Sequence, residues 1–316
     1  MEQRRLGRSG IAVPPLMFGG NVFGWTVDKA ASHRLLDRLV EVGLNAIDTA
    51  DVYSAWVPGH QGGESETIIG EWLQARGNRG KVVIATKVGM KMGSGEEGLS
   101  RAWIMQEVEA SLRRLRTDVI DLYQAHKDDA ATPLEETLGA FADLIKAGKV
   151  RAIGASNYTA PRLKLALETS AKLGLPRYET LQPLYNLMDR KVFEAELAPL
   201  CQAEGIGVIN FYALAAGFLS GKYRSEADLS KSVRGGGVKD YLNPRGFRIL
   251  GALDEVARRR ESTPARVALA WLIARPSVTA PIASATSLEQ LNDLLESTRL
   301  ELDRADFELL TRASAY

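Results

Sequence analysis

The feature that most constrains this chain is the regular alternation of short apolar segments with segments of helical periodicity along its whole length. One helical segment places Ile104, Val108 and Leu112 on the same face, as an amphipathic helix requires. The apolar segments are short and bounded by turn residues, so they predict strands. The predicted strands are residues 15–19, 45–49, 81–87, 119–123, 150–154, 179–182, 207–211 and 278–283.

Strands that alternate with helices in this way predict a parallel sheet. On the pattern alone, a closed eight-stranded barrel and an open doubly wound sheet both remain possible. Two observations favour the barrel: no linker rich in Gly, Pro and Ser divides the chain, and no dinucleotide fingerprint opens the first strand–helix unit. The GSGEEG match at residues 93–98 starts six residues after Lys87, outside the tight turn that a pyrophosphate requires. We therefore expect an α/β fold, a (β/α)8 TIM barrel, with residues 1–316 forming one domain.

Three segments lie outside the eightfold pattern. Residues 3–13 predict an N-terminal β-hairpin, and residues 303–313 predict an extra C-terminal helix. After the seventh strand, residues 221–248 form a long charged connection with three consecutive glycines from Gly235. Long connections of this kind are often functional, and the charges and glycines of this one suit a mobile lid.

The charge balance excludes several classes of function. Forty basic and 39 acidic residues give a formal net charge of +1, which supplies no field for binding nucleic acid or an anionic membrane. The longest uncharged run, residues 205–221, contains Asn210 and four glycines, and it predicts a strand entering a loop rather than a membrane span. A single cysteine, Cys201, excludes an internal disulfide and a multi-cysteine metal site. We expect a cytoplasmic protein without a bound metal.

Chemically reactive side chains follow three successive predicted strands. Asp48 and Tyr53 come at the end of the second strand, Lys87 ends the third, and His126 follows the fourth. Because the carboxyl ends of barrel strands meet at one mouth, we expect these four side chains to lie together. Each alone is more often a cap, a packing residue or a surface charge. Their joint occurrence is what indicates a catalytic site.

The four residue types suit proton transfer at a carbonyl or alcohol oxygen. A free phenol has a pKa near 10, and a neighbouring ammonium favours its ionised form. We therefore expect Lys87 to lower the pKa of Tyr53 toward the working pH, Asp48 to pair with Lys87, and His126 to position the substrate oxygen. An alternative is a Schiff-base lyase or aldolase in which Lys87 is the nucleophile.

Segments along nearly the whole chain resemble the aldo-keto reductase superfamily, in the order that this family shows. They read NAIDTADVYS, ESETIIGEWL, VVIATKVG, DVIDLYQAHKDD, GKVRAIGASN and QPLYN. The segment GFLSGKY at residues 217–223 is similar to the branch that includes bacterial reductases and potassium-channel β-subunits. The resemblance implies a nicotinamide-dependent oxidoreductase that interconverts aldehydes or ketones, sugars among them, with alcohols. The channel subunits suggest another alternative, a module that binds the cofactor and reports its redox state to a partner.

By this resemblance, Asp48, Tyr53, Lys87 and His126 match the catalytic tetrad, with Tyr53 as the proton donor in reduction and the base in oxidation. Other matches imply contacts to the cofactor from three regions. Those at the nicotinamide end are Ser156, Asn157, Gln182 and Phe211. Those in the covering loop are Tyr212, Leu214, Gly217, Ser220, Gly221 and Lys222. Those at the adenosine end are Ser284, Thr286, Gln290 and Asp293.

The chain departs from the family at the adenosine end. Thr286 stands where an arginine that reads the 2′-phosphate of NADP is often found, and Leu294 replaces a familiar asparagine. Related members use an arginine in the long loop near the offset of Arg234, so Arg234 is expected to supply the missing cation. The resemblance therefore implies NADP(H), narrowly favoured over NAD(H).

The substrate is expected to lie among the connections at the mouth. Trp25 and Trp56 belong to such connections and predict a wall for an aromatic or sugar ring, whereas loop packing is the favoured reading of His60. Glu66 and Gly70 match family positions behind the site, where the resemblance implies a structural role. We expect a small carbonyl or alcohol compound as the partner, and the sequence carries no signal for the oligomeric state.

Overall fold

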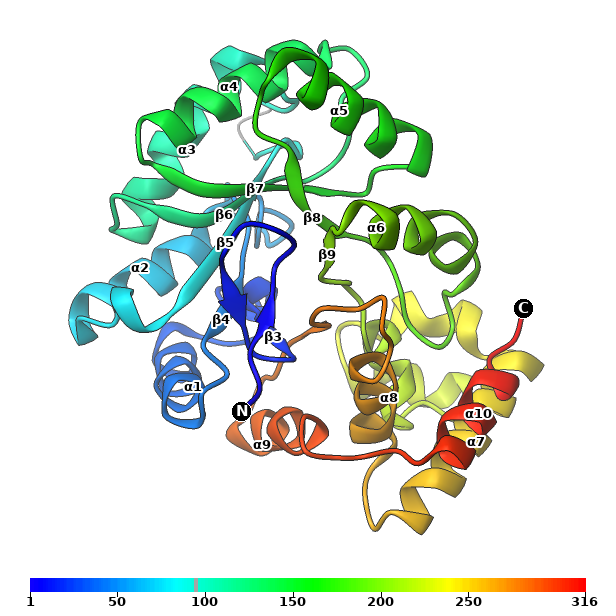
Figure 1. The fold of residues 1–316 in the computed structure, drawn as a ribbon. Coiled ribbons are helices and arrows are strands. Elements are labelled where there is room, and N and C mark those ends of the chain that lie inside the picture. The colour runs from blue at the N-terminus through cyan, green and yellow to red at the C-terminus, as the bar shows by residue number, and fades with distance from the viewer. Residues whose placement is uncertain (94–95) are drawn as a thin grey trace.

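The computed structural model describes residues 1–93 and 96–316, so Ser94 and Gly95 of the glycine-rich motif lie outside the described residues. Strands and helices alternate along the chain (Figure 1). The main sheet contains β3 (Met17–Gly19), β4 (Ala46–Asp48), β5 (Val83–Val88), β6 (Ile120–Ala125), β7 (Val150–Ser156), β8 (Tyr178–Gln182), β9 (Gly207–Val208) and β10 (Ile282–Ala283). Every predicted strand is confirmed, although β9 and β10 keep only two residues each.

Helices cover the outer face of this sheet. They are α1 (Lys29–Val42), α2 (Glu64–Arg76), α3 (Arg101–Leu115), α4 (Leu134–Lys146), α5 (Ala160–Leu173), α6 (Ala198–Glu204), α7 (Pro244–Arg259), α8 (Pro264–Ile273), α9 (Leu288–Ser297) and α10 (Arg304–Ala313). Polar residues start many of them: Asp28, Ser100 and Thr159 each accept a hydrogen bond from a backbone amide in the first turn. The apolar faces of the helices pack on the sheet and form the larger of two hydrophobic cores.

The sheet curls until its two edges meet. Its order is β10-β3-β4-β5-β6-β7-β8-β9, and all neighbouring strands are parallel. At the seam, the amides of Thr279 and Ile282 donate to the carbonyls of Val208 and Asn210 at 2.8 and 2.9 Å. The (β/α)8 barrel is therefore confirmed, and the open doubly wound alternative is wrong.

The predicted N-terminal hairpin closes one end of the barrel. It consists of β1 (Arg4–Arg5) and β2 (Ala12–Val13), which pair antiparallel, and it lies across the barrel in Figure 1. Its buried Leu6, Ile11 and Val13 belong to the second hydrophobic core, together with inward-facing strand residues that include Met17, Ala46, Ala85, Leu122 and Ala152. Apolar side chains thus fill this end, and the polar interior residues lie toward the opposite end.

The connection after β9 differs from the expected long loop. It contains the short helices η4 (Ala215–Ser220), η5 (Glu226–Lys231) and η6 (Gly235–Tyr241) and then enters α7. The predicted end of the loop at residue 248 is wrong, because Asn243 caps α7 by accepting from the amide of Gly246 and Pro244 favours a helical first turn. The extra C-terminal helix is confirmed as α10, with Asp303 as its cap.

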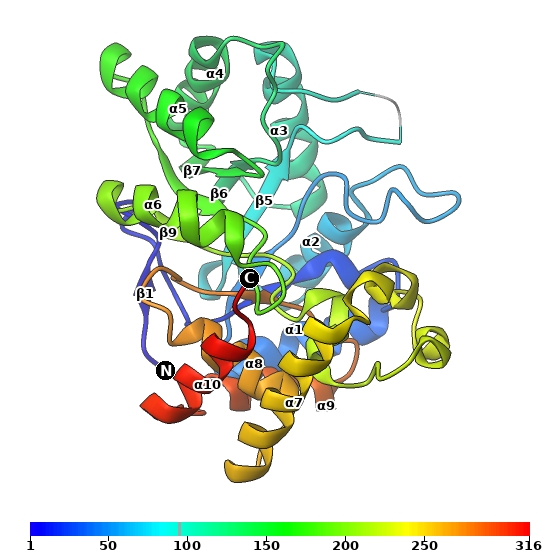
Figure 2. The same cartoon turned by 90° about the vertical axis from the view of Figure 1, so that its right-hand side faces the viewer.

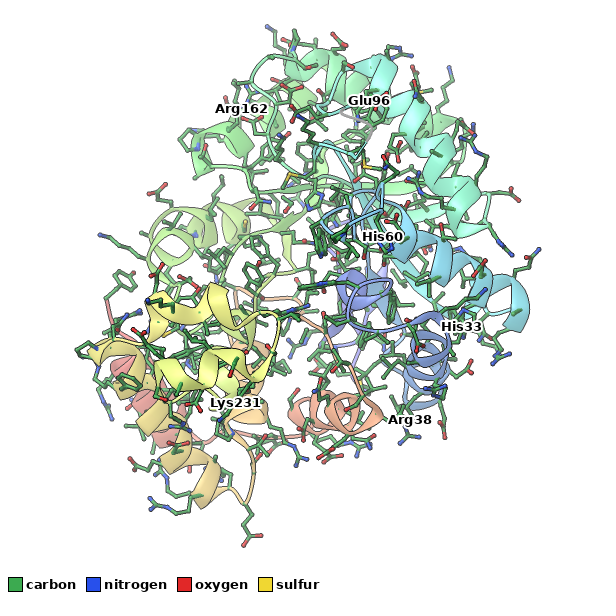
Figure 3. All side chains as sticks on the ribbon, turned by 180° about the vertical axis from the view of Figure 1, so that it is seen from behind. His33, Arg38, His60, Glu96, Arg162 and Lys231 are labelled. Carbon is green, nitrogen blue, oxygen red and sulfur yellow. The ribbon has the colours of Figure 1, made fainter. Side chains whose placement is uncertain are left out.

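The open end of the barrel is the side on which the longest connections project. In Figure 2 the connections after β4 and β5 and the segment containing η5 and η6 extend to one side, away from the N-terminal hairpin. Figure 3 views the molecule from that side, with His60 on the first of these connections and Lys231 on the last. We call this end the mouth. In the described part of the chain, no helix combines the length and the hydropathy that a bilayer crossing needs.

Gly154 of β7 occupies a tight place in the barrel interior. A Cβ at this position would lie 2.1 Å from Thr180 Oγ1 and 3.2 Å from Gln124 Cγ. We expect Gly154→Ala to lower the free energy of unfolding by about 1–3 kcal/mol, because overpacking forces neighbouring groups to move. Urea denaturation followed by circular dichroism measures this change.

Gly139 in α4 provides the matched control, since nothing lies within 4 Å of a Cβ placed there. Gly139→Ala should raise the free energy of unfolding by about 0.5–1 kcal/mol through helix propensity. A Gly154→Ala protein as stable as the wild type would contradict the close approach of these strands.

Candidate active site

Three side chains from β4, β5 and the connection after β4 meet at the mouth. Lys87 Nζ donates to Asp48 Oδ2 at 2.7 Å and lies 2.8 Å from both the Thr49 carbonyl oxygen and Tyr53 Oη. Tyr53 Oη donates to Asp48 Oδ2 at 3.3 Å. The structure therefore brings together the amine, the carboxylate and the phenol that the sequence singles out.

Lys87 is completely buried, so its charge needs compensation. Burial lowers the pKa of Lys87, and the carboxylate of Asp48 opposes that change. The ammonium has an oxygen neighbour for each of its three N–H bonds. This geometry matches a charged lysine that acts on its neighbours electrostatically and does not match a free amine nucleophile.

The pKa of Tyr53 moves in the direction opposite to the sequence expectation. Burial of the hydroxyl, and next the charge of Asp48, raise the pKa of Tyr53 well above its usual value near 10. The prediction that Lys87 lowers this pKa toward neutrality is therefore wrong for this arrangement. Desolvation of a phenolate beside a carboxylate outweighs the attraction of the ammonium. Tyr53 thus keeps its proton at neutral pH.

His126, which follows β6, faces Tyr53. Their ring centroids are 6.0 Å apart and the ring planes are inclined by 71°. Burial, and next the charge of Lys87, lower the pKa of His126 well below its usual value, so the imidazole is neutral near pH 7. Its Nδ1 is buried and has no hydrogen-bond partner among the described residues. A neutral imidazole in this position can still exchange a hydrogen bond with a substrate oxygen.

Gln124 of β6 is a neighbour of the site that the sequence analysis does not single out. Its Nε2 donates to Asp48 Oδ1 at 3.4 Å, and Gln182 Nε2 donates to the same oxygen at 2.8 Å. The signal was available in the strand pattern: Gln124 is two residues after the inward-facing Leu122, and it pairs in register with Lys87.

The residues expected at the nicotinamide end lie at the ends of β7 and β8. Ser156 pairs with Gln182 across these strands, and Ser156 Oγ donates to the carbonyl of Gln182 at 2.9 Å. Asn157 has a φ of 56°, and its Nδ2 donates to the carbonyl of His126 at 2.9 Å. The structure therefore places Ser156, Asn157 and Gln182 beside the Asp48–Lys87 pair and His126.

The covering segment expected from the sequence has an unusual backbone. Tyr212, Ala215 and Ala216 have φ values of 53°, 48° and 53°, a left-handed region that non-glycine residues rarely adopt. Such strain persists mainly at functional segments. Phe211 precedes this stretch, and its backbone forms an isolated parallel β-bridge with that of Leu184. The remaining expected residues, Leu214, Gly217, Ser220, Gly221 and Lys222, lie in η4 or at its borders.

At the adenosine end, the expected residues follow β10 and continue into α9, and Ser284 comes directly after β10. The amide and the hydroxyl of Thr286 donate to Gln290 Oε1 at 2.9 and 3.1 Å. Asp293 pairs with Arg266 of α8 at 2.6 Å. Arg266 is a second residue that the sequence analysis does not single out. Its partner Asp293 is 27 residues away in the chain, so no local pattern joins the two.

Aromatic side chains line one wall of the mouth. The rings of Trp25 and Trp56 meet edge to face at 5.5 Å, and those of Trp56 and Tyr53 at 6.1 Å. The guanidinium of Arg234 lies 5.0 Å from the centroid of Trp25. We call Trp25, Trp56 and Tyr53 the aromatic wall. The two tryptophans expected to contact substrate thus stand next to the reactive phenol.

A buried charged cluster supports the site from behind. Thr86 and Arg114 both donate to Glu66, at 2.5 and 2.6 Å. Burial, and next the charge of Glu66, raise the pKa of Asp51 well above its usual value. A Cβ on Gly70 would lie 2.0 Å from the carbonyl oxygen of Arg114, so α2 and α3 approach this closely only with glycine there. These contacts agree with the structural role expected of Glu66 and Gly70.

The mouth has features that fit a nicotinamide cofactor. Gln124 Oε1, like His126 Nδ1, is buried without a hydrogen-bond partner among the described residues. Ala215, Ala216 and Gly217 follow one another with positive φ, and the amides of Ala215 and Gly217 donate to the carbonyls of Tyr212 and Leu214. Lys222 adds a cation beside Gly217, where a Cβ would lie 3.3 Å from Lys222 Cε. The positive charge of Lys222 suits a phosphate-bearing group at this segment.

Comparison with known proteins finds relatives along the whole chain. The model of the aldo/keto reductase family matches residues 15–315. "Uncharacterized oxidoreductase YrpG" of Bacillus subtilis (strain 168) is 34% identical, over 98% of this chain and 95% of the relative. "Protein tas" of Escherichia coli (strain K12) is 33% identical, over 100% and 99%. "Probable voltage-gated potassium channel subunit beta" of Arabidopsis thaliana is 32% identical, over 94% and 91%.

The neutral state of His126 makes a prediction about pH and stability. Because the pKa of His126 is lower in the folded protein than in the unfolded chain, the unfolded chain takes up a proton first as the pH falls below about 6.5. This contribution lowers the free energy of unfolding by up to about 1.4 kcal/mol per pH unit. We expect His126→Gln to remove it, as measured by urea denaturation between pH 7 and pH 5.

The comparison with the wild type isolates His126, because Asp51 and the other titrating groups are present in both proteins. His33→Gln, at a partly exposed position of α1, controls for the loss of a histidine. If wild type and His126→Gln lost stability in parallel as the pH fell, His126 would not be buried in its neutral form.

Proposed function

The chain belongs to the aldo/keto reductase family, and on this premise we propose that it interconverts aldehydes or ketones, sugars among them, with alcohols, using a nicotinamide cofactor. The observation that carries the proposal is the buried contact of Lys87 with both Asp48 and Tyr53, with neutral His126 facing the phenol. This arrangement holds a proton donor at the mouth and surrounds it with groups that can bind a carbonyl oxygen.

Tyr53 would donate its proton to the carbonyl oxygen as negative charge develops there. Its raised pKa keeps the phenol protonated until a stronger base, the forming alkoxide, lies against it. Lys87 would stabilise the phenolate that remains, because its ammonium is 2.8 Å from Tyr53 Oη. In the direction of alcohol oxidation, the same phenolate would act as the base.

His126 and Asp48 have positioning roles in this proposal. His126 would exchange a hydrogen bond with the substrate oxygen, and its neutral state avoids a second positive charge beside Lys87. Asp48 holds the ammonium by its Oδ2, while Gln124 and Gln182 hold Oδ1. The carboxylate is thereby fixed, which keeps Lys87 aligned with the phenol.

Members of this family use nicotinamide cofactors, whose C4 carries the hydride to or from the substrate carbon. We propose that Ser156, Asn157, Gln182 and Phe211 hold the nicotinamide end and that the strained segment with Tyr212, Leu214, Gly217, Ser220, Gly221 and Lys222 covers the pyrophosphate. Ser284, Thr286, Gln290 and Asp293 would surround the adenosine. NADP(H) is narrowly favoured over NAD(H), with Arg234 of the segment after β9 as the cation that would meet the 2′-phosphate in place of the arginine that Thr286 replaces.

The alternative functions have weaker support. A lyase would need Lys87 as a free amine, whereas its nitrogen is buried and surrounded by three oxygens. A regulatory module that reports redox state is suggested by the potassium-channel relative, but the reactive residue types are all present here. We further propose that residues 1–316 act as one domain in the cytoplasm, on a small substrate bound against Trp25 and Trp56.

Replacing the phenol tests the mechanism. We expect Tyr53→Phe to reduce kcat for aldehyde reduction by about 10²- to 10⁴-fold, the usual contribution of a general acid. The dissociation constant of the reduced cofactor should stay near the wild-type value, because the variant loses a single hydroxyl group. Steady-state kinetics and cofactor fluorescence titration measure the two quantities.

Tyr123→Phe is the matched control, because Tyr123 Oη is buried and has no hydrogen-bond partner among the described residues. It should retain turnover. Near-normal kcat in Tyr53→Phe would reject the proposed acid, and covalent labelling of Lys87 by aldehyde and borohydride would favour the lyase instead.

Cofactor preference gives a separate prediction. We expect fluorescence titration to show tighter binding of NADPH than of NADH. Arg234→Gln should narrow the difference about tenfold, since the cation proposed to meet the 2′-phosphate is lost while NADH lacks that group. Tighter binding of NADH by the wild type would overturn the proposed preference.

A further inference from the structure

The turn of residues 186–189, between β8 and α6, is built around a buried asparagine. We call it the anchor turn. The Asn186 side chain is fully buried, and its Oδ1 accepts hydrogen bonds from the amides of Met188 and Asp189 at 2.7 and 3.0 Å. A side chain bonded to its own turn in this way is fixed in orientation. Its amide nitrogen is therefore left to bond to other groups.

The anchor turn holds the start of the segment that follows β9. Asn186 Nδ2 donates to the carbonyl of Tyr212 at 3.0 Å, and the amide of Ala215 donates to the same carbonyl at 2.7 Å. Tyr212 and Ala215 have positive φ, and strained backbone of this kind persists only where surrounding contacts determine it. Asn186 thus holds the residue at which the strained stretch begins.

The same turn also holds the other end of this segment. Tyr241, the last residue of η6, donates its hydroxyl hydrogen to Asp189 Oδ2 at 2.9 Å. Asn186 Nδ2 donates to that same oxygen at 3.0 Å. A chain of hydrogen bonds through the anchor turn therefore connects Tyr212 with Tyr241.

We call residues 212–241 the mouth segment. It contains η4, η5 and η6, and Figure 3 shows Lys231 of η5 on the side of the molecule where the mouth opens. Gly217 and Lys222, which are proposed to cover the pyrophosphate, belong to it. A loop whose two ends are held on one turn has fewer conformations than a loop held at one end, because closing a loop removes chain entropy. The contacts of the anchor turn therefore influence how readily these residues can leave the cofactor.

We propose that Asn186 and Asp189 are positioning residues for the nicotinamide cofactor, which slow its release by holding the mouth segment in place. Asn186 is fully buried, and both of its N–H bonds are used within the protein. It therefore acts through the mouth segment and not by contact with a ligand. Asp189 acts through Tyr241, and its carboxylate makes that hydrogen bond stronger than one between neutral groups. This inference rests on the proposed cofactor binding.

Removing the Tyr241 hydroxyl tests the far end of the mouth segment. The full-length protein is loaded with NADPH, and release is followed by the decrease of NADPH fluorescence after mixing with excess NADP⁺ in a stopped-flow instrument. We expect Tyr241→Phe to raise the dissociation rate about tenfold, because a hydrogen bond to an ionised acceptor is lost. The ring remains in the variant, so its contact with the ring of Phe218, at 5.5 Å between centroids, is kept.

Two comparisons distinguish positioning from a general loosening of the fold. Tyr185→Phe is the matched control, because Tyr185 Oη donates at 2.7 Å to Glu194, a carboxylate outside the anchor turn, and it should leave the dissociation rate unchanged. Asp189→Asn keeps an oxygen that can accept from Tyr241 and should release NADPH more slowly than Asp189→Ala, which has none. Equal acceleration in Tyr185→Phe and Tyr241→Phe would overturn the inference, as would a wild-type rate in Tyr241→Phe.

Hydrogen exchange in the cofactor-free protein separates this inference from the proposed function. We expect Tyr241→Phe, but not Tyr185→Phe, to speed amide exchange in residues 213–240, as measured by mass spectrometry of peptides. If the wild type binds neither NADPH nor NADH, the proposed function fails, and the exchange of these residues alone decides whether the anchor turn holds the segment. If the wild type binds NADPH and Tyr241→Phe exchanges these residues at the wild-type rate, the proposed function stands and the inference is wrong.

Discussion

A positive charge inside a barrel determines how the rest of the mouth is built. Lys87 is removed from water, so its ammonium depends on Asp48 Oδ2 at 2.7 Å for compensation. The other oxygen of Asp48 is held by Gln182, which is in turn bonded to Ser156. Strands that are far apart in sequence thereby share one polar network. Each member has a partner that would be left buried and unsatisfied if that member were lost.

Much of this architecture could be predicted from the chain, because strand–helix alternation and residue spacing are local properties. Parallel strands bring their carboxyl ends to one place, so the positions of Asp48, Lys87 and His126 after successive strands were sufficient to group them. The direction of the Tyr53 pKa was not accessible in this way. It depends on how desolvation competes with an ammonium and a carboxylate, and the competition is decided by burial that only the folded arrangement reveals.

Other features lacked a local signal. The segment after β9 reads as a loop because it is charged and rich in glycine, yet a capping box between Ser225 and Asp228 starts the short helix η5. Gln124 looks like an ordinary strand residue in the sequence. Its place beside the Asp48 carboxylate follows from its pairing in register with Lys87 on the neighbouring strand. The position of Arg234 over Trp25 joins residues that are more than 200 positions apart in the chain. Such contacts depend on tertiary structure, so composition and periodicity do not reveal them.

The hairpin that closes one end of the barrel restricts how small molecules can reach the barrel interior. The hairpin and the apolar core beneath it close one end of the barrel, so its interior is open at the mouth. A small molecule that reaches the polar side chains inside the barrel must therefore enter and leave at the mouth. The packing of Leu6, Ile11 and Val13 at the closed end thus limits access to the polar interior to the opposite end.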